Sequence, residues 1–410
     1  MAEWSETFTF LGKRDMATAD LTLPRSGLDF EAFRQLENEE LESRIRTAKQ
    51  EMGEDLLILG HHYQQDEVIQ FADLTGDSYR LASLAALNDR CRAIVFCGVH
   101  FMAETADILA NAKPRKSGVE VSTRGSCATL AIGHDAERVN VVLPDLSAGC
   151  SMADMADIDQ VEECWVQLAE LIDTGDVMPV TYINSAADLK AFCGRNGGIV
   201  CTSSNAEAAL RWSFAQRRKV LFFPDQHLGR NTAKRMGIPL DEMALWDPRL
   251  PLGGNTAETI QRARVLLWRG HCSVHQMFRP EHVTQFRQRV PGIQILVHPE
   301  CMMQVVDMAD QVGSTEYILR TVREAPAGSK WAIGTELHLV NRLKCQHPNQ
   351  EIHFLSPMVC MCATMYRIDL HHICWTLENL VQGTPVNVIR VPGEIAHWAR
   401  IALERMLAVK

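Results

Sequence analysis

The side chains best suited to chemistry are concentrated in residues 270–301. These thirty-two residues include Cys272, His275, His298, Glu300 and Cys301. The last three follow the apolar run 293–297, which is typical of a buried strand in a parallel sheet. Polar groups just past the carboxyl end of such a strand lie where open α/β sheets bind their ligands. Glu300 is therefore a candidate general acid or base, and Tyr63 is a second candidate earlier in the chain.

The same order of features occurs three times along the chain. Each time, a strand ends in an aromatic or histidine side chain: His61, Tyr182 and His298. A hydroxyl at a turn into a helix comes 17, 21 and 17 residues later: Ser78, Ser203 and Thr315. A histidine follows after 22 to 24 more residues, and each repeat ends on a cysteine: Cys150, Cys272, and Cys360 or Cys362. This repeat predicts three similar units whose strand ends meet in one central cavity.

One cysteine from each repeat would place three thiolates around one point. Thiolates select zinc, copper(I) or iron–sulfur clusters. If three thiolates hold a [4Fe–4S] cluster, one iron has no protein ligand and can act as a Lewis acid. A structural zinc site normally has four ligands in close pairs, and the only close pair among these cysteines is Cys360 and Cys362. The spacing also permits an ordinary core role, as expected for five others: Cys91, Cys97, Cys193, Cys201 and Cys374.

Hydroxyl side chains near predicted helix starts indicate a site for a small polyanion, because free backbone N–H groups there attract carboxylate or phosphate. Four residues have this position: Ser78, Ser203, Ser314 and Thr315. Three more could add side-chain donors: His298, Tyr182 and Asn184. The histidines that recur inside the repeats are interpreted as structural: His100, His227 and His338. For every residue of this set, the alternative is a polar group that only contacts water at a strand end.

The elements that position these residues are short apolar strands alternating with helical segments, the pattern of parallel α/β sheets. Strands followed by polar residues are predicted at 56–60, 93–97, 139–143, 178–182, 198–201, 220–223, 293–297, 331–333 and 352–355. We therefore predict an α/β protein of three units related by a pseudo-threefold axis, with parallel sheets whose strand ends surround one central cavity.

The repeat divides the chain into four segments. Residues 1–54 form a lead-in, in which 31–53 have the charge pattern of a solvated covering helix. The first two α/β domains are residues 55–155 and 156–276, and the third is 277–410 together with C-terminal helices and a strand at 387–391. Residues 115–139, basic and then rich in glycine and serine, are interpreted as an insertion that carries Cys127.

Composition argues against several classes of function. The 410 residues have a formal net charge of −10 and a pI of about 5.8, so a dominant role with nucleic acid or an anionic membrane is not expected. No apolar run is long enough for a membrane span, and the first residues lack the pattern of a signal peptide. The expected location is the cytoplasm, where the 13 cysteines would stay reduced.

Taken together, the motifs resemble those of the quinolinate synthase (NadA) family. The matching segments run in order over about residues 55–380 and include 60–64, 76–78, 98–104, 150–153, 182–185, 201–205, 224–229, 270–275, 297–301, 312–315 and 334–336. The resemblance implies three α/β/α domains around a [4Fe–4S] cluster with three cysteine ligands. It also implies condensation of iminosuccinate with dihydroxyacetone phosphate to quinolinate, with release of phosphate and water, and a functional link to L-aspartate oxidase.

The resemblance also implies roles for individual residues. By position, the cluster ligands would be Cys150, Cys272 and Cys362. Cys362 is preferred to Cys360 because the family's last ligand precedes a methionine and a leucine-bearing helix, as Cys362 precedes Met365 and Leu370. Iminosuccinate would be bound by His61, Ser78, Tyr182, Asn184, Ser203, His298, Glu300 and Thr315. Tyr63 matches a mobile active-site tyrosine, and it forms the expected catalytic set with Glu300 and His298.

The chain departs from the family pattern at His62, where other members often have Asn or Tyr, and in its longer lead-in and insertion. Two rival interpretations use the same cysteines. An iron–sulfur hydro-lyase of the aconitase type would act on a different hydroxy acid, and product analysis with dihydroxyacetone phosphate separates it from the first interpretation. An iron–sulfur or redox sensor predicts a DNA-binding helix pair or a basic arm, and the sequence shows neither. A structural zinc protein would be colourless.

Overall fold

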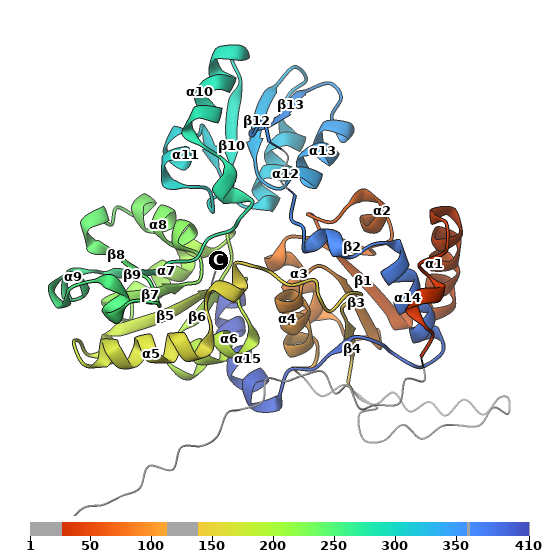
Figure 1. Cartoon of the computed structure of the whole chain (residues 1–410), viewed down its shortest axis with the longest axis horizontal. Coiled ribbons are helices and arrows are strands. Elements are labelled where there is room, and N and C mark those ends of the chain that lie inside the picture. Colours follow the sequence, from red (N-terminus) through yellow and green to blue (C-terminus); the bar gives the residue numbers. More distant parts are fainter. Residues whose placement is uncertain (1–26, 113–137, 359–360, 410) are drawn as a thin grey trace, which may run out of the picture.

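The computed structural model describes residues 27–112, 138–358 and 361–409. These residues form three parallel-dominated sheets with helices packed around them, arranged as three lobes (Figure 1). Nearly all of the predicted insertion, including Cys127, lies outside the described residues, as do residues 1–26 of the lead-in and the alternative ligand Cys360.

The first sheet has the strand order β14-β4-β3-β1-β2. Its strands are β1 (Leu56–His61), β2 (Leu74–Gly76), β3 (Ala93–Cys97), β4 (Asn140–Val142) and β14 (Val388–Ile389). All neighbours are parallel except β14, which pairs antiparallel with β4. The helices between these strands are α2 (Asp66–Ile69), α3 (Ser78–Leu87) and α4 (His100–Ala110). Strands β1 and β3 are almost fully buried, as their near-continuous apolar sequences require.

The second sheet has the order β6-β5-β7-β9-β8 and is entirely parallel. Its strands are β5 (Val177–Tyr182), β6 (Ile199–Cys201), β7 (Lys219–Phe223), β8 (Met243–Trp246) and β9 (Val265–Trp268). Its helices are α5 (Ile158–Ala169), α6 (Ala187–Arg195), α7 (Ala206–Phe214), α8 (Gln226–Arg235) and α9 (Ala257–Arg262).

The third sheet has the order β11-β10-β12-β13 and is also parallel. Its strands are β10 (Gln294–Val297), β11 (Gln311–Val312), β12 (Lys330–Gly334) and β13 (Glu351–Phe354). Its helices are α10 (Pro280–Arg289), α11 (Met303–Met308), α12 (Thr315–Glu324) and α13 (Leu337–Gln346).

The three sheets repeat one topology. In each, the second strand along the chain pairs on one side of the first, and the third strand pairs on its other side: β2-β1-β3, β6-β5-β7 and β11-β10-β12. The first strands end at or immediately before His61, Tyr182 and His298, the residues that begin each repeat. The predicted α/β architecture with three similar units is therefore confirmed.

The lead-in contributes a helix that is shorter than predicted. Instead of a single helix over 31–53, a 3-10 turn at η1 (Phe30–Ala32) is followed by α1 (Asn38–Met52). One face of α1 buries Leu41, Ile45 and Ala48, and the helix packs against α14 (Leu370–Val381). Its exposed residues include several charged side chains, as expected of a covering helix.

The C-terminal residues do not stay with the third sheet, although the predicted segment 277–410 grouped them with it. β14 completes the first sheet, and α15 (Gly393–Ala408) packs against α6 of the second unit. The two helices touch so closely that a Cβ on Gly194 would lie 1.9 Å from the carbonyl oxygen of Trp398. One apolar core consequently joins the first two units and the C-terminal helices, whereas residues of the third unit form two smaller cores.

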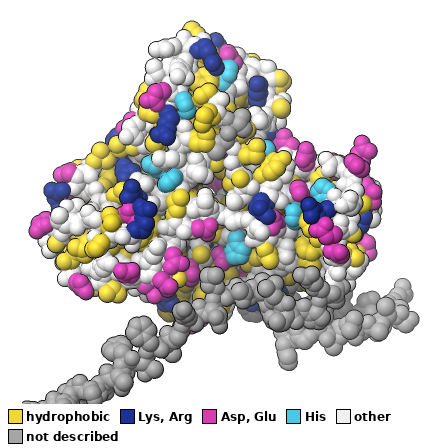
Figure 2. Space-filling model, in the orientation of Figure 1, with side chains coloured by type: hydrophobic (Ala, Val, Ile, Leu, Met, Phe, Trp, Pro, Cys, Tyr) yellow, Lys and Arg dark blue, Asp and Glu magenta, His cyan; other side chains and the backbone are white. Residues whose placement is uncertain are grey.

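The surface shows no sorting of charge by sign on the face drawn in Figure 2, where basic and acidic side chains are interspersed over all three lobes. Among the described residues, no helix combines the length and apolar character needed to cross a membrane.

Candidate functional site

A cavity of about 70 Å³ lies where the carboxyl ends of the three sheets meet, as expected for parallel α/β units. It is lined by all twelve predicted site residues: His61, Tyr63, Ser78, Cys150, Tyr182, Asn184, Ser203, Cys272, His298, Glu300, Thr315 and Cys362. This volume exceeds what one water needs by several-fold. The structure thus brings together residues from all three units, and their chemical roles stay predictions.

The three cysteines reach the cavity from equivalent places in the three units. Cys150 follows β4, Cys272 follows β9 and Cys362 follows β13, and all three are free and half-buried thiols. Burial raises the pKa of each thiol, to about 12 at Cys150, and the neighbouring sulfurs add to the shift at Cys150 and Cys272. A bound metal would reverse this, because it stabilises the thiolate form. The donor set therefore fits a metal group with three sulfur ligands.

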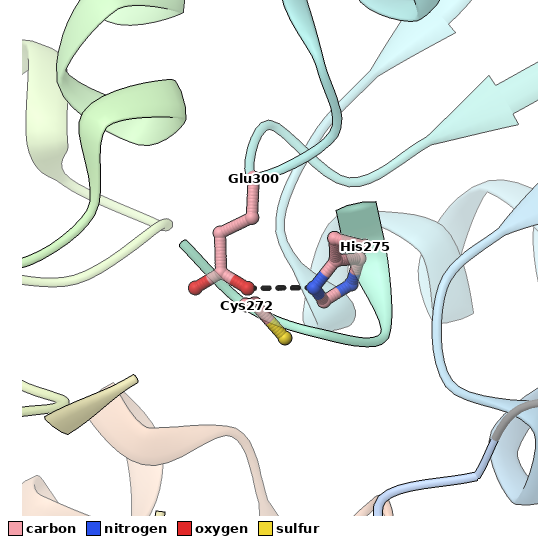
Figure 3. Close-up of side chains that lie close together, drawn as sticks. All are labelled: Cys272, His275 and Glu300. Atoms are coloured by element: carbon pink, nitrogen blue, oxygen red, sulfur yellow. Dashed lines mark ion pairs between the residues drawn. The ribbon is translucent and has the colours of Figure 1, made fainter. Parts of the chain in front are cut away.

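Glu300 is one of the buried carboxyl groups of the cavity, with 3 % of its surface exposed. It comes from the turn after β10, and its Oε2 lies 2.7 Å from Nδ1 of His275 in η7 (His275–Met277), as Figure 3 shows. The same oxygen lies 3.6 Å from Nδ1 of His298. Burial alone would raise the pKa of Glu300, but His275, His298 and the Tyr182 hydroxyl lower it to about 2. The group is therefore a carboxylate at neutral pH.

The two imidazoles beside Glu300 stack on each other, with ring centroids 4.5 Å apart. Burial, followed by the proximity of His275, lowers the pKa of His298 to about 3, so His298 is neutral at neutral pH. Burial likewise lowers the pKa of His61 to about 3. His298 and His61 therefore act as hydrogen-bonding groups and not as fixed cations.

Among the described residues, no hydrogen-bond partner is found for two acceptor atoms of the lining residues Asn184 and Glu300, namely Oδ1 and Oε1. Buried polar atoms in folded proteins are almost always paired. Since both residues line the cavity, a ligand or ordered water is the natural partner for these two acceptors.

Tyr63 is held at the border between the first and third units. Its hydroxyl lies 3.0 Å from Oγ1 of Thr315 and 2.8 Å from Oγ1 of Thr335. Burial raises the pKa of the Tyr63 phenol well above its ordinary value. Tyr63 is therefore a neutral hydroxyl that can donate a hydrogen bond or a proton.

Helix starts contribute the rest of the lining. Ser78 is the first residue of α3, Thr315 is the first residue of α12, and Ser203 lies in the turn before α7. Ser314 caps α12 by accepting from Tyr317 N–H at 3.4 Å, and it is not among the lining residues. No Lys or Arg is found among the lining residues that the structure describes. An anion in the cavity would be held by hydroxyls, imidazoles and backbone N–H groups.

Several residues at the site carried no predicted role. His275 pairs with Glu300, Asp77 and Glu336 line the cavity, and Thr335 binds Tyr63. Burial raises the pKa of Glu336 to about 7, and its carboxylate caps α13 by accepting from His338 N–H at 2.7 Å. A signal was present for each: His275 comes three residues after a predicted ligand, Thr335 and Glu336 follow the predicted strand 331–333, and Asp77 directly precedes Ser78.

The recurring histidines do not line the cavity, and their structural role stays a prediction. His100 begins α4, while His227 and His338 lie in the first turns of α8 and α13. The five cysteines predicted as core residues are all buried.

Three of the cavity's groups could also hold a single metal ion. The ligand atoms of Cys272, His275 and Glu300 all lie within 4.8 Å of one another (Figure 3). Sulfur, imidazole and carboxylate are a set that zinc accepts. The same cavity thus offers either a mixed set or three thiols.

Fold and site together define an α/β protein of three repeated units that share one ligand cavity rich in thiols. The family model described as Quinolinate synthetase A protein matches residues 43–139 and 131–408. A quinolinate synthase of Rhodopirellula baltica is 64 % identical over 379 residues, covering 92 % of this chain and 93 % of the relative. Those of a Nocardioides species and of Corynebacterium glutamicum are 54 % and 50 % identical, covering 90 % and 94 % of this chain and 89 % and 92 % of theirs. The chain belongs to the NadA family.

Proposed function

We propose that this protein is a quinolinate synthase of NAD biosynthesis. It would condense iminosuccinate with dihydroxyacetone phosphate to quinolinate, with release of phosphate and water. Iminosuccinate would come from L-aspartate oxidase, and the reaction would take place in the cytoplasm. The observation that carries the proposal is the convergence of one thiol from each unit with Glu300 in a single cavity, in a chain that belongs to this family.

Cys150, Cys272 and Cys362 would hold a [4Fe–4S] cluster, one thiolate from each unit. The equivalent origin of the three sulfurs and their position around one cavity support this ligand set over a closed four-ligand zinc site. When bound, such a cluster supplies a Lewis-acidic iron without a protein ligand, which favours the loss of water from a hydroxy acid.

The hydroxyl and amide groups of the cavity would bind the dicarboxylate. Ser78 and Thr315 lie on the first turns of α3 and α12, where backbone N–H groups favour carboxylate oxygens. Ser203, Asn184 and Tyr182 would bind from the second unit, and His61 and His298 would add neutral imidazoles. Among the lining residues that the structure describes, no Lys or Arg side chain would hold back a product dianion.

Glu300 and Tyr63 would move protons during the condensation. Glu300 is ionised, and its Oε1 has no partner, so this atom is available to accept a proton from carbon or nitrogen of the substrate. Tyr63 keeps its proton at neutral pH and can donate it to a departing oxygen. His298 would orient the substrate next to Glu300.

The test is to purify the protein without oxygen, reconstitute it with iron and sulfide, and measure quinolinate formed from the two substrates. Cys150→Ala, Cys272→Ala and Cys362→Ala should each lose the brown chromophore and all quinolinate formation. Cys345→Ala, an exposed cysteine on α13, is the matched control and should keep both. An intact chromophore in the three variants would refute the ligand set, and a brown wild-type protein that makes no quinolinate would refute the reaction.

A further inference from the structure

The guanidinium of Arg342, in the third unit, forms hydrogen bonds with the loop that carries Tyr63. Arg342 on α13 donates from Nη1 to the carbonyl oxygen of His62 at 2.9 Å and from Nη2 to that of Gln64. Its Nε binds Oδ1 of Asp66 at 2.5 Å. The two carbonyls lie on either side of Tyr63, so one planar fork fixes the backbone before and after this residue.

The same loop has other contacts with the third unit. His62 Nε2 lies 2.9 Å from a carboxylate oxygen of Glu316 on α12, and the Tyr63 hydroxyl binds Thr315 and Thr335. Within the loop, Tyr63 N–H binds the ring of His61 at 3.2 Å. Tyr63 therefore belongs to the first unit by sequence, while its hydroxyl and flanking backbone are held by the third. Figure 1 shows α13 and α2 as neighbours across this border.

Arg342 itself is outside the cavity lining, and only 13 % of its side chain is exposed. A half-buried guanidinium needs a counterion and several acceptors to offset its desolvation, and Asp66 with the two carbonyls supplies them. Simple attachment of two units would need only one such contact. Two bonds that bracket a single residue, with a third to Asp66, instead restrict where that residue's side chain can lie.

We propose that Arg342 is a positioning residue for Tyr63, which sets the phenol at the cavity from the third unit. The expected effect on kcat rests on the proposed function. The inference adds a role for a residue that does not touch substrate. Lysine cannot reproduce it, because an ammonium lacks the planar fork that reaches both carbonyls. Docking of the third unit on the first would therefore be a condition for placing the phenol.

The first test is hydrogen exchange of the backbone in residues 61–66, which needs no activity. Arg342→Met and Arg342→Lys should speed exchange there at least tenfold relative to the wild type. Lys344→Met, an exposed cation on the same helix, is the control and should leave exchange unchanged. Unchanged exchange in both Arg342 variants would overturn the proposal, whatever their turnover.

The second test is a double-mutant cycle with Tyr63→Phe. Arg342→Met alone should lower kcat about 10- to 100-fold, the cost of a misplaced reacting group, with the iron–sulfur spectrum kept. In the Tyr63→Phe background the same change should lower kcat less than threefold further, since the phenol it positions is already gone. An equal loss in both backgrounds would show a structural role and overturn the proposal.

A milder variant is available in case Arg342→Met destabilises the whole protein. If Arg342→Met lowers thermal stability so far that it cannot be assayed, Asp66→Asn replaces it in both experiments, because it loosens the guanidinium without removing it. It should give the same pattern with smaller changes, and no change in either experiment would overturn the proposal. The variants could show faster exchange while the wild-type protein forms no quinolinate. That result would refute the proposed function, but the positioning of the loop by Arg342 would still hold.

Discussion

Replacing Glu300 by glutamine removes the negative charge of this buried side chain and keeps its shape. The glutamine oxygen can take the position of Oε2, 2.7 Å from His275 Nδ1. Its amide nitrogen then takes the position of Oε1, which has no partner among the described residues. The fold and the three thiols should therefore be unaffected, and the variant isolates the effect of the charge.

The cost in stability follows from the pKa of Glu300. A pKa of about 2 against an ordinary value of 4.5 corresponds to an upper limit of roughly 3 kcal/mol of stabilisation above pH 5. This contribution is lost as the pH falls through the folded-state pKa. Because burial keeps His298 neutral at neutral pH, the actual contribution is that of a charged hydrogen bond, about 1.5–3 kcal/mol. We expect Tm to fall by a few degrees.

The cost in activity should be much larger. Loss of a positioned general base typically lowers the rate about 10²- to 10⁴-fold, and glutamine cannot accept the proton. The assay is quinolinate formation under anaerobic conditions, with the absorption spectrum and iron content recorded on the same sample. Glu324→Gln, an exposed glutamate at the end of α12, is the control. Turnover within threefold of the wild type in Glu300→Gln would remove Glu300 from proton transfer.

Two further changes test the fold around the site. Gly194→Ala should destabilise the protein by about 1–3 kcal/mol, because the new Cβ would lie 1.9 Å from Trp398 O, whereas Gly393→Ala meets nothing within 4 Å and should have little effect in urea denaturation. Equal stability of the two variants would contradict this close contact of α6 and α15. Lys190→Met should abolish a pH-dependent gain in stability. Burial lowers the pKa of Lys190 from 10.5 to about 8, so the unfolded chain binds the proton more tightly and wild-type stability should rise between about pH 8 and 10.5, by up to about 3 kcal/mol. The same rise in Lys190→Met, measured by urea denaturation at both ends of this range, would assign it to other groups.

Much of the architecture could be predicted because strands buried on both faces have near-continuous apolar sequences. The runs at 56–60, 93–97 and 220–223 are β1, β3 and β7 to within one residue at each end. Strands β2, β8, β9 and β11 were not predicted. β2 and β11 are only two or three residues long and partly exposed, and β8 and β9 have only four residues each. The helix predicted over 31–53 begins at Asn38 because residues 30–36 form a 3-10 turn and a bend. Charge spacing alone does not reveal such a break.

The candidate site could be assembled from the sequence because its members lie after strands in a repeat. Their pairings could not, since they depend on how the units dock. His275 and Glu300 lie on either side of α10, and nothing in their spacing indicates a 2.7 Å contact. The sequence also did not reveal that β14 and α15 pack on the first two units. The apolar face of a helix shows that the helix is packed but does not identify the partner.

The way the units are joined bears on how the cavity is completed. The first two share one apolar core with the C-terminal helices, so their relative position is fixed by burial of large side chains. The third has separate cores, and the contacts that tie its residues to the others include polar ones such as Arg342 with Asp66 and Asn231 with Pro299 O at 2.8 Å. An exposed polar contact such as that of Arg342 with Asp66 breaks and forms at much lower cost than an apolar core does. Two of the cavity's walls are therefore rigidly placed, while the wall with His298, Glu300 and Thr315 is held by a small number of directed bonds. Several of those bonds end on the loop of Tyr63, so this loop and the third wall are positioned in part by the same contacts.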